Sequence, residues 1–174
     1  MCASLSQRKD PTEELEFATH LIKSVMDGID REKSIASMHV CRGNWSKDES
    51  ILLEGPYTPL LDLFSDINAD LLALEFSTPR AGELKSLLAD DRIKNKLILG
   101  LGVLNPRFDE KEDVDLIYDR AKEALSYIDK ENLWLNPDCG FATFSNRPVN
   151  EHENIKAKVG SMVEARDRLR ADYE

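Results

Sequence analysis

The chain alternates between short apolar runs and longer segments of helical periodicity, and this alternation restricts its fold more than any other feature. The runs lack a clean polar–apolar alternation, which is typical of strands that are covered on both faces. They recur roughly every 30 to 37 residues, the length of one strand and its helical crossover. The predicted strands span residues 33–40, 69–77, 96–104 and 132–141, and the predicted helices span residues 11–29, 58–68, 81–93, 110–128 and 150–173.

This order, one helix followed by four βα units, predicts an α/β fold with a parallel sheet. No linker-like or low-complexity segment interrupts it, so we expect one domain over residues 1–174. Four βα units make half of an eight-stranded barrel, and they also suffice for a small open sheet. The periodicity alone leaves both architectures open.

Composition narrows the classes of partner and the compartment. The net charge of −10 argues against nucleic acid or an anionic membrane as the main partner, because both attract basic surfaces. No apolar run approaches the roughly 20 residues that span a bilayer, and the N-terminus lacks the apolar core of a signal peptide. The 3 cysteines are an odd number and widely spaced, which indicates reduced thiols or metal thiolates. We therefore predict a cytoplasmic protein.

A histidine and a cysteine stand two positions apart where the first predicted strand ends, His39 and Cys41. In a strand, residues i and i+2 point to the same side, so the imidazole and the thiol share one face. Both groups are good zinc ligands. The pair by itself is weak evidence, because this spacing also arises by chance.

Two further ligand-type residues follow later strands. Glu75 comes directly after a run of four apolar residues, and Cys139 follows the turn signal Asn-Pro-Asp at 136–138. The carboxyl ends of parallel strands form the edge where α/β proteins build their sites. Together with His39 and Cys41, these residues supply a tetrahedral shell for zinc, which thiolates favour over magnesium or calcium.

The same residues have plainer interpretations. Cys139 is also acceptable as a small buried apolar residue, and His39 as a capping residue. The carboxylate of Glu75 is also satisfied by an ion pair with Arg42 or Arg80. On the residues alone, a zinc site and a metal-free core both remain open.

Three strings resemble a known family: "HVCRGNW" at 39–45, "LALEFS" at 72–77 and "LWLNPDCGF" at 133–141. They are similar to the C-terminal catalytic half of the cobalamin-independent methionine synthase superfamily, above all to its shorter methionine-synthase-like members. Each string falls at the expected strand end and in the expected order. The resemblance implies that the chain forms the C-terminal half of a TIM (β/α)8 barrel.

The resemblance also implies a cofactor and a chemistry. In that family one zinc is bound at the positions that match His39, Cys41, Glu75 and Cys139. The zinc activates a homocysteine-type thiol for methyl transfer from a methyl donor, in methionine biosynthesis. Of the four ligands, the carboxylate of Glu75 is the one we expect to yield a coordination position to the substrate sulfur. The implied partners are thus a small-molecule thiol and a methyl donor.

The chain departs from the long methionine synthases at two points. It has no acidic D-E-P-type motif of the kind that binds the amino acid upstream of the metal motif. The stretch after the third predicted strand reads Asn-Pro-Arg at 105–107 and lacks the catalytic histidine of the long enzymes. Asn44 and Asp138, beside the metal motifs, are weak candidates for contacts with substrate; both also suit turns.

Half a barrel would leave strand edges open, so we expect a homo-oligomer or a partner half. Three classes of function follow from these observations. The first is a zinc-dependent methyltransferase-like protein. The second is a non-catalytic zinc-binding half barrel, and the third is a metal-free α/β domain.

Overall fold

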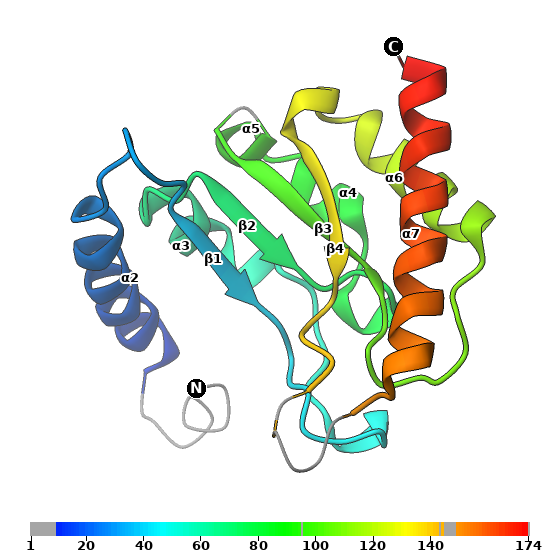
Figure 1. Ribbon diagram of the computed structural model, residues 1–174. Coiled ribbons are helices and arrows are strands. Elements are labelled where there is room, and N and C mark those ends of the chain that lie inside the picture. The colour runs from blue at the N-terminus through cyan, green and yellow to red at the C-terminus, as the bar shows by residue number, and fades with distance from the viewer. Residues whose placement is uncertain (1–9, 95, 143, 145–148, 174) are drawn as a thin grey trace.

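The computed structural model describes residues 10–94, 96–142, 144 and 149–173. Within them the chain forms a four-stranded parallel sheet with strand order β1-β2-β3-β4 (Figure 1). The strands are β1 (Ser37–Val40), β2 (Leu71–Leu74), β3 (Ile98–Leu104) and β4 (Leu133–Pro137). The helices are α2 (Pro11–Asp27), α3 (Leu61–Asp66), α4 (Leu84–Leu88), α5 (Asp91–Lys94), α6 (Val114–Leu125) and α7 (His152–Tyr173). The predicted parallel βα order is confirmed.

Helix boundaries follow local capping chemistry. Helix α2 begins after Asp10, whose carboxylate accepts a hydrogen bond from the Thr12 amide, and Pro11 takes the first helical position. The segment predicted as one helix at 81–93 is instead two short helices. Helix α4 ends at its C-cap Ala89, and the Asp90 carboxylate then accepts the Arg92 amide at 2.9 Å, a contact typical of the start of a new helix, here α5.

The segment predicted as a helix at 58–68 begins with a 3-10 turn at Thr58–Leu60, and α3 follows it. Further 3-10 turns lie at Glu49–Ile51, Pro79–Ala81 and Lys130–Asn132. The first strand starts later than predicted, at Ser37. Just before it, the Ala36 amide is bound by the Asp70 carboxylate at 2.7 Å instead of by a neighbouring strand.

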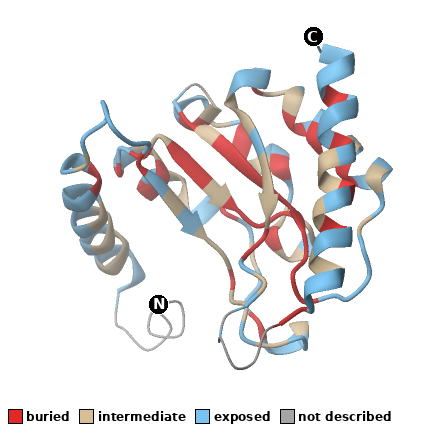
Figure 2. Cartoon of the chain, in the orientation of Figure 1, coloured by how far each residue is buried: buried red, intermediate tan, exposed pale blue. Residues whose placement is uncertain are grey.

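The core lies between the sheet and its helices. Helices α3 to α6 lie on one side of the sheet in Figure 1, and the strands β2 and β3 are the most buried part of the molecule (Figure 2). Buried side chains of the sheet and of α4 form one cluster, which includes Leu72, Leu74, Leu99, Leu101, Leu84 and Leu87. Burial of such side chains is the main stabilising term, at about 1.5–3 kcal/mol for each.

The opposite face of β1 is polar and open. Met38 and Val40 pack against the core, so that Ser37 and His39 point away from it and are exposed. Both β1 and β4 are edge strands with one neighbour each. No helix among the described residues is long and apolar enough to cross a membrane.

Candidate metal centre

Two of the predicted ligands come from the carboxyl end of β1. His39 lies in the strand, and Cys41 is the first residue after the strand ends. The third, Cys139, follows β4, which is the opposite edge of the sheet. For these residues to meet, the chain after β4 has to cross the ends of β3 and β2.

Asp138 holds that crossing in place. Its amide donates to the Leu104 carbonyl at the end of β3, at 2.8 Å. Its Oδ1 accepts the amides of Phe76 and Ser77 after β2, at 3.0 Å each, and Oδ2 is hydrogen-bonded to the Ser77 hydroxyl. Gly102 provides the space, because an added Cβ there would lie 2.6 Å from the Leu74 carbonyl oxygen. The result is that Cys139 is carried across to the end of β1.

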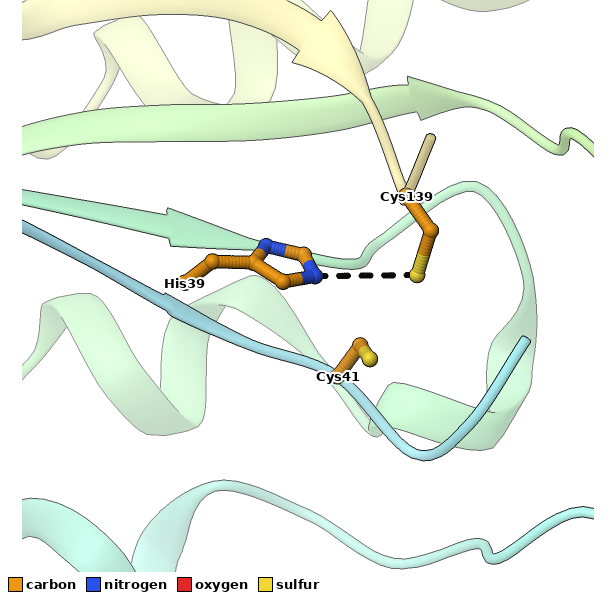
Figure 3. A group of neighbouring side chains, drawn as sticks. All are labelled: His39, Cys41 and Cys139. Carbon is orange, nitrogen blue, oxygen red and sulfur yellow. Dashed lines mark hydrogen bonds between the residues drawn. The ribbon is translucent and has the colours of Figure 1, made fainter. Parts of the chain in front are cut away.

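Three ligand-type side chains converge at that point. One donor atom from each of His39, Cys41 and Cys139 lies within 4.8 Å of the others, and Cys139 Sγ lies 3.6 Å from His39 Nε2 (Figure 3). His39 Nδ1 donates to the Ala73 carbonyl at 3.0 Å, since a carbonyl can only accept. This tautomer leaves the lone pair on Nε2, the atom that faces the two thiols.

The electrostatics of the three groups are unequal. The hydrogen bond with Cys139, and then that with His39, hold the pKa of the Cys41 thiol far below its usual value. The same contact with Cys41, together with burial, raises the pKa of Cys139. The hydrogen bond with Cys41 raises the pKa of His39, against the effect of burial. A cation placed among these groups would meet the Cys41 thiolate directly, and it would displace a proton from the His39 imidazole, whose pKa is raised.

Glu75, the fourth predicted ligand, lies outside this group of three. It is 1% exposed, and its Oε1 is 3.3 Å from Arg42 Nη1, while Oε2 is 3.8 Å from Arg80 Nη2. The ion pair considered from the sequence is therefore present. Oε2 nonetheless has no hydrogen-bond partner among the described residues. That leaves one buried carboxylate oxygen whose ion-pair partner is the Arg80 guanidinium.

Asn44 and Asp138, the weaker candidates, both have positioning contacts. Asn44 Nδ2 donates to the Gly140 carbonyl at 2.6 Å, which ties the loop of Cys41 to the turn of Cys139. Asp138 is 0% exposed, and burial raises its pKa to about 6 against the hydrogen bonds from Ser77. Each fixes the relative position of the two cysteines.

Sequence reasoning missed Tyr57, which links the ends of β1 and β2. Its hydroxyl donates to the Val40 carbonyl at 2.9 Å and accepts the Glu75 amide at 3.1 Å, and the Arg42 guanidinium lies 4.0 Å over its ring. Tyr57 lies in a loop between β1 and β2, and nothing in the local sequence indicates which strand ends it reaches. Its position after Pro56 is the only local signal.

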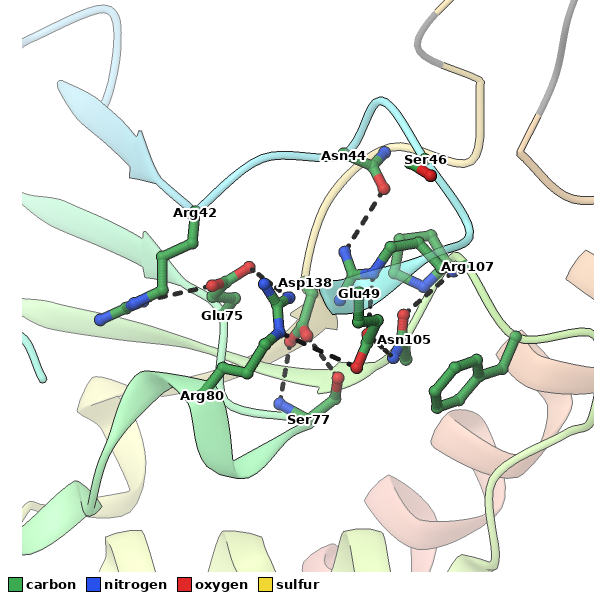
Figure 4. Close-up of polar contacts among 12 residues, drawn as sticks. Arg42, Asn44, Ser46, Glu49, Glu75, Ser77, Arg80, Asn105, Arg107 and Asp138 are labelled. Carbon is green, nitrogen blue, oxygen red and sulfur yellow. Dashed lines mark hydrogen bonds and ion pairs between the residues drawn. The ribbon is translucent and has the colours of Figure 1, made fainter. Parts of the chain in front are cut away.

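Sequence reasoning also missed the buried partners of the loop that follows Cys41. Glu49 pairs there with Arg107 and Asn105, residues that the sequence singled out only because no histidine stands in that stretch (Figure 4). These polar residues at the strand ends form one continuous network beside the thiols.

The fold and the site together define a parallel α/β domain with a two-thiol, one-imidazole cluster at the carboxyl edge of its sheet. Residues 3–168 match the family described as "Cobalamin-independent synthase, Catalytic domain", and the chain belongs to that family. The resemblance inferred from the three sequence strings is thereby confirmed.

Relatives in this family differ in how much is known of them. The chain is 34% identical over 145 residues to the Bacillus subtilis "Uncharacterized protein YxjG", covering 82% of this chain and 37% of that protein. It is 30% identical over 174 residues to the "Methionine synthase" of Thermoplasma acidophilum, covering 90% of this chain and 44% of that protein.

The fold matches that of solved members. A B12-independent methionine synthase from Shewanella sp. W3-18-1, solved with selenomethionine, superposes with a TM-score of 0.69 at 17% identity, covering 90% of this chain and 44% of that one. The likeness to part of a TIM-barrel protein is thus confirmed at the level of the fold. The chain spans less than half the length of the relatives described here.

Proposed function

We propose that this chain is the metal-binding half of a zinc-dependent transferase that activates a thiol for methyl or alkyl transfer. The observation that carries the proposal is the convergence of His39 Nε2 with the Sγ atoms of Cys41 and Cys139 at one strand-end site. Thiol and imidazole donors are the set that zinc prefers. Bound zinc would lower the pKa of a substrate thiol and hold it as a nucleophilic thiolate at neutral pH.

Each ligand has a separate task in this proposal. His39 presents Nε2 in a fixed tautomer, because Nδ1–H is held by the Ala73 carbonyl. Cys41 supplies a thiolate with little cost in deprotonation. Cys139 supplies the second sulfur from the far edge of the sheet, which makes the site dependent on the complete sheet.

Glu75 completes the proposed set as an exchangeable oxygen ligand. Its Oε2 is buried and lacks a hydrogen-bond partner among the described residues, so a cation would satisfy it. Arg42 and Arg80 would receive the carboxylate again when it leaves the metal. The two arginines thereby offer a second resting place, which favours Glu75 over the cysteines as the ligand that gives way.

For the acceptor we propose a homocysteine-type thiol. Support comes from relatives such as the "5-methyltetrahydropteroyltriglutamate--homocysteine methyltransferase" of Bacillus subtilis, which is 26% identical over 163 residues, 94% of this chain and 18% of that enzyme. Because the chain spans so small a part of that enzyme, the methyl donor would be bound by a further half of the barrel. This half would come from a second copy or from a partner.

A second candidate is a zinc-binding half barrel without catalysis. This candidate is favoured because the segment between β3 and α6 has no histidine at the place where the long enzymes carry their catalytic one. Asn105 and Arg107 lie in that segment and make buried contacts with Glu49. The metal site would then stabilise the fold and present a surface. The two candidates differ in whether an added thiol reaches the metal.

Zinc retention tests the site. We expect close to one zinc per chain in the wild type, near-complete loss against a chelator in Cys139→Ser, and a smaller loss in Glu75→Gln. His20→Gln is the matched control, because His20 is exposed on α2, far from the thiols in the chain. A wild type free of zinc after expression in zinc-supplemented medium would refute the metal site.

Proton release tests the chemistry. Calorimetry in two buffers of different ionisation enthalpy should show one proton released per thiol bound to the zinc form. No release would leave zinc with a structural role and favour the second candidate. Equal zinc loss in Glu75→Gln and Cys139→Ser would refute the exchangeable role of Glu75.

A further inference from the structure

The carboxylate of Glu49 is held in a small cage of donors beside the metal centre. Its Oε1 accepts Asn105 Nδ2 at 2.7 Å and Arg107 Nε at 2.9 Å, and its Oε2 lies 3.8 Å from Arg80 Nε (Figure 4). Burial raises the pKa of Glu49, but the hydrogen bonds from Asn105 and Arg107 outweigh it, so the pKa lies below its usual value. Glu49 is therefore an anion at neutral pH.

The donors of the cage are more deeply buried than the Glu49 carboxylate that they bind. The Arg107 side chain is 0% exposed and Asn105 is 3% exposed, whereas the Glu49 side chain keeps 23% of its surface in solvent. Glu49 is the first residue of the 3-10 turn Glu49–Ile51, and Ile51, the last residue of this turn, is 57% exposed. Asn105 and Arg107 follow the end of β3 and are buried, and Arg80 lies in the 3-10 turn Pro79–Ala81, whereas Glu49 lies in a more exposed turn.

The cage also offers more donors than Glu49 uses. Arg107 Nη2 and Arg80 Nη2 are buried and have no hydrogen-bond partner within the described part of the chain. The ion pairs of this network join Arg42, Arg80 and Arg107 to the carboxylates of Glu49 and Glu75. The third carboxylate, that of Asp138, is hydrogen-bonded to the Ser77 hydroxyl instead (Figure 4). A pair built only for stability would satisfy its buried donors, because leaving them unmet is costly.

The cage is connected to the thiols through one residue. Arg107 Nη1 donates to Asn44 Oδ1 at 3.4 Å, and Asn44 Nδ2 donates to the carbonyl of Gly140, which follows Cys139. The cage and the thiols are therefore joined through Asn44, which contacts Arg107 on one side and the residue after Cys139 on the other. This placement suits one small molecule with an anionic group and a thiol.

We propose that Arg80, Asn105 and Arg107 form a carboxylate-binding subsite, and that Glu49 occupies it in the free protein as an internal stand-in for the carboxylate of the substrate. The substrate class is then a small thiol that carries a carboxylate; the thiol half of this statement rests on the proposed function, the carboxylate half does not. A guanidinium binds a carboxylate through two N–H groups at once, so the incoming group takes over the bonds to Glu49 and gains Arg107 Nη2, which has no hydrogen-bond partner among the described residues. Glu49 moves to solvent with its turn, where water hydrates it.

Propionate, which has no thiol, tests the subsite in the metal-free chain by ligand-detected NMR or calorimetry. Glu49→Gln should bind propionate roughly tenfold more tightly than the wild type, because the stand-in anion is gone and its charge-assisted bonds pass to the ligand. Arg107→Gln should lose the binding. Since Arg107 is buried, Arg80→Gln, at a side chain 10% exposed, serves as a second loss variant that is easier to fold.

Glu54→Gln is the matched control for Glu49→Gln. Glu54 is exposed on the same loop, so this variant removes the same charge without touching the cage, and it should bind propionate as the wild type does. Equal propionate affinity in the wild type, Glu49→Gln and Arg80→Gln would overturn the proposal. Tighter binding of inorganic phosphate than of propionate would overturn the assignment to a carboxylate.

The zinc form separates this proposal from the proposed function. There, 3-mercaptopropionate should bind at least roughly tenfold more tightly than 2-mercaptoethanol, and Arg80→Gln should abolish the difference. A protein that binds no zinc yet shows the propionate response would refute the proposed function and leave the subsite supported. A protein that binds zinc and binds both thiols with equal affinity would refute the carboxylate subsite and leave the proposed function supported.

Discussion

Replacing Gly102 with alanine should damage the fold and the metal centre together. Gly102 lies in β3, under the segment that carries Cys139 across the sheet. A Cβ at this position would contact Asp138 Oδ1 and would lie 2.6 Å from the Leu74 carbonyl oxygen and 3.0 Å from Glu75 Cα. Two of these three neighbours are backbone atoms of the adjacent strand end, so they cannot rotate away.

The expected loss is about 3 to 5 kcal/mol in the free energy of unfolding. Forcing an extra carbon into a packed interior costs about 1 to 3 kcal/mol. Asp138 must then give up its bonds to the amides of Phe76 and Ser77, each worth about 1 kcal/mol. The two contributions add because they fall on different groups: the overpacking on the backbone of Leu74 and Glu75, and the lost hydrogen bonds on the Asp138 carboxylate.

Urea unfolding followed by circular dichroism measures this loss, with Gly160→Ala as the control. Gly160 is an exposed position of α7 where an added Cβ meets nothing within 4 Å, so alanine should raise the free energy of unfolding by about 0.5 to 1 kcal/mol. An unfolding free energy for Gly102→Ala within about 0.5 kcal/mol of the wild type would show that the crossing does not depend on this glycine. Zinc retention in the same variant should fall, since Cys139 follows Asp138 directly.

Three shorter predictions concern the same end of the sheet. Tyr57→Phe should lower the free energy of unfolding by about 1 to 3 kcal/mol in urea titrations, because it leaves the Val40 carbonyl and the Glu75 amide buried without a partner; a neutral result would mean that water replaces the hydroxyl. In the metal-free chain, iodoacetamide should modify Cys41 well before Cys139 at pH 6 to 7, because the lowered pKa of Cys41 keeps its thiolate present as the pH falls. Peptide mass spectrometry measures the order of modification. If Cys139 were modified first, the opposite directions of the two pKa shifts would be contradicted. Light scattering should show self-association, because β1 and β4 both have an unpaired edge, and a stable monomer at high concentration would count against the half-barrel interpretation.

The fold could be predicted from sequence because its signals are local. Short apolar runs and helical periodicity identified all four strands and the long helices α2, α6 and α7. The predictions were wrong where local polar contacts decide the matter. Asp90 begins a new helix within the segment at 81–93, and Lys33 and Ser34, predicted as strand, are bound by the Asp30 carbonyl in a turn.

The site could be predicted only in part, for a similar reason. The proximity of His39, Cys41 and Cys139 could be predicted because each stands at or just after a strand end, and parallel topology brings strand ends to one edge; their role as metal ligands stays a prediction. Their partners were not found, since Tyr57 and Arg107 reach the site from loops whose path depends on tertiary packing. Glu75 shows the remaining ambiguity, because its sequence position fits a metal ligand and an ion pair equally. In the structure its Oε1 is bound by Arg42, whereas its Oε2 has no hydrogen-bond partner among the described residues.

His39 and Cys139 are separated by 100 positions in the chain although their side chains touch. A ribosome therefore completes the first donor pair long before it produces the last donor, and the nascent chain carries His39 and Cys41 without their counterpart while β2, β3 and β4 are still being made. The sulfur-to-sulfur spacing is consequently a readout of the docking of β4 against the rest of the sheet. A short bifunctional thiol reagent, applied during refolding, would join Cys41 to Cys139 only in molecules whose fourth strand has already taken its place.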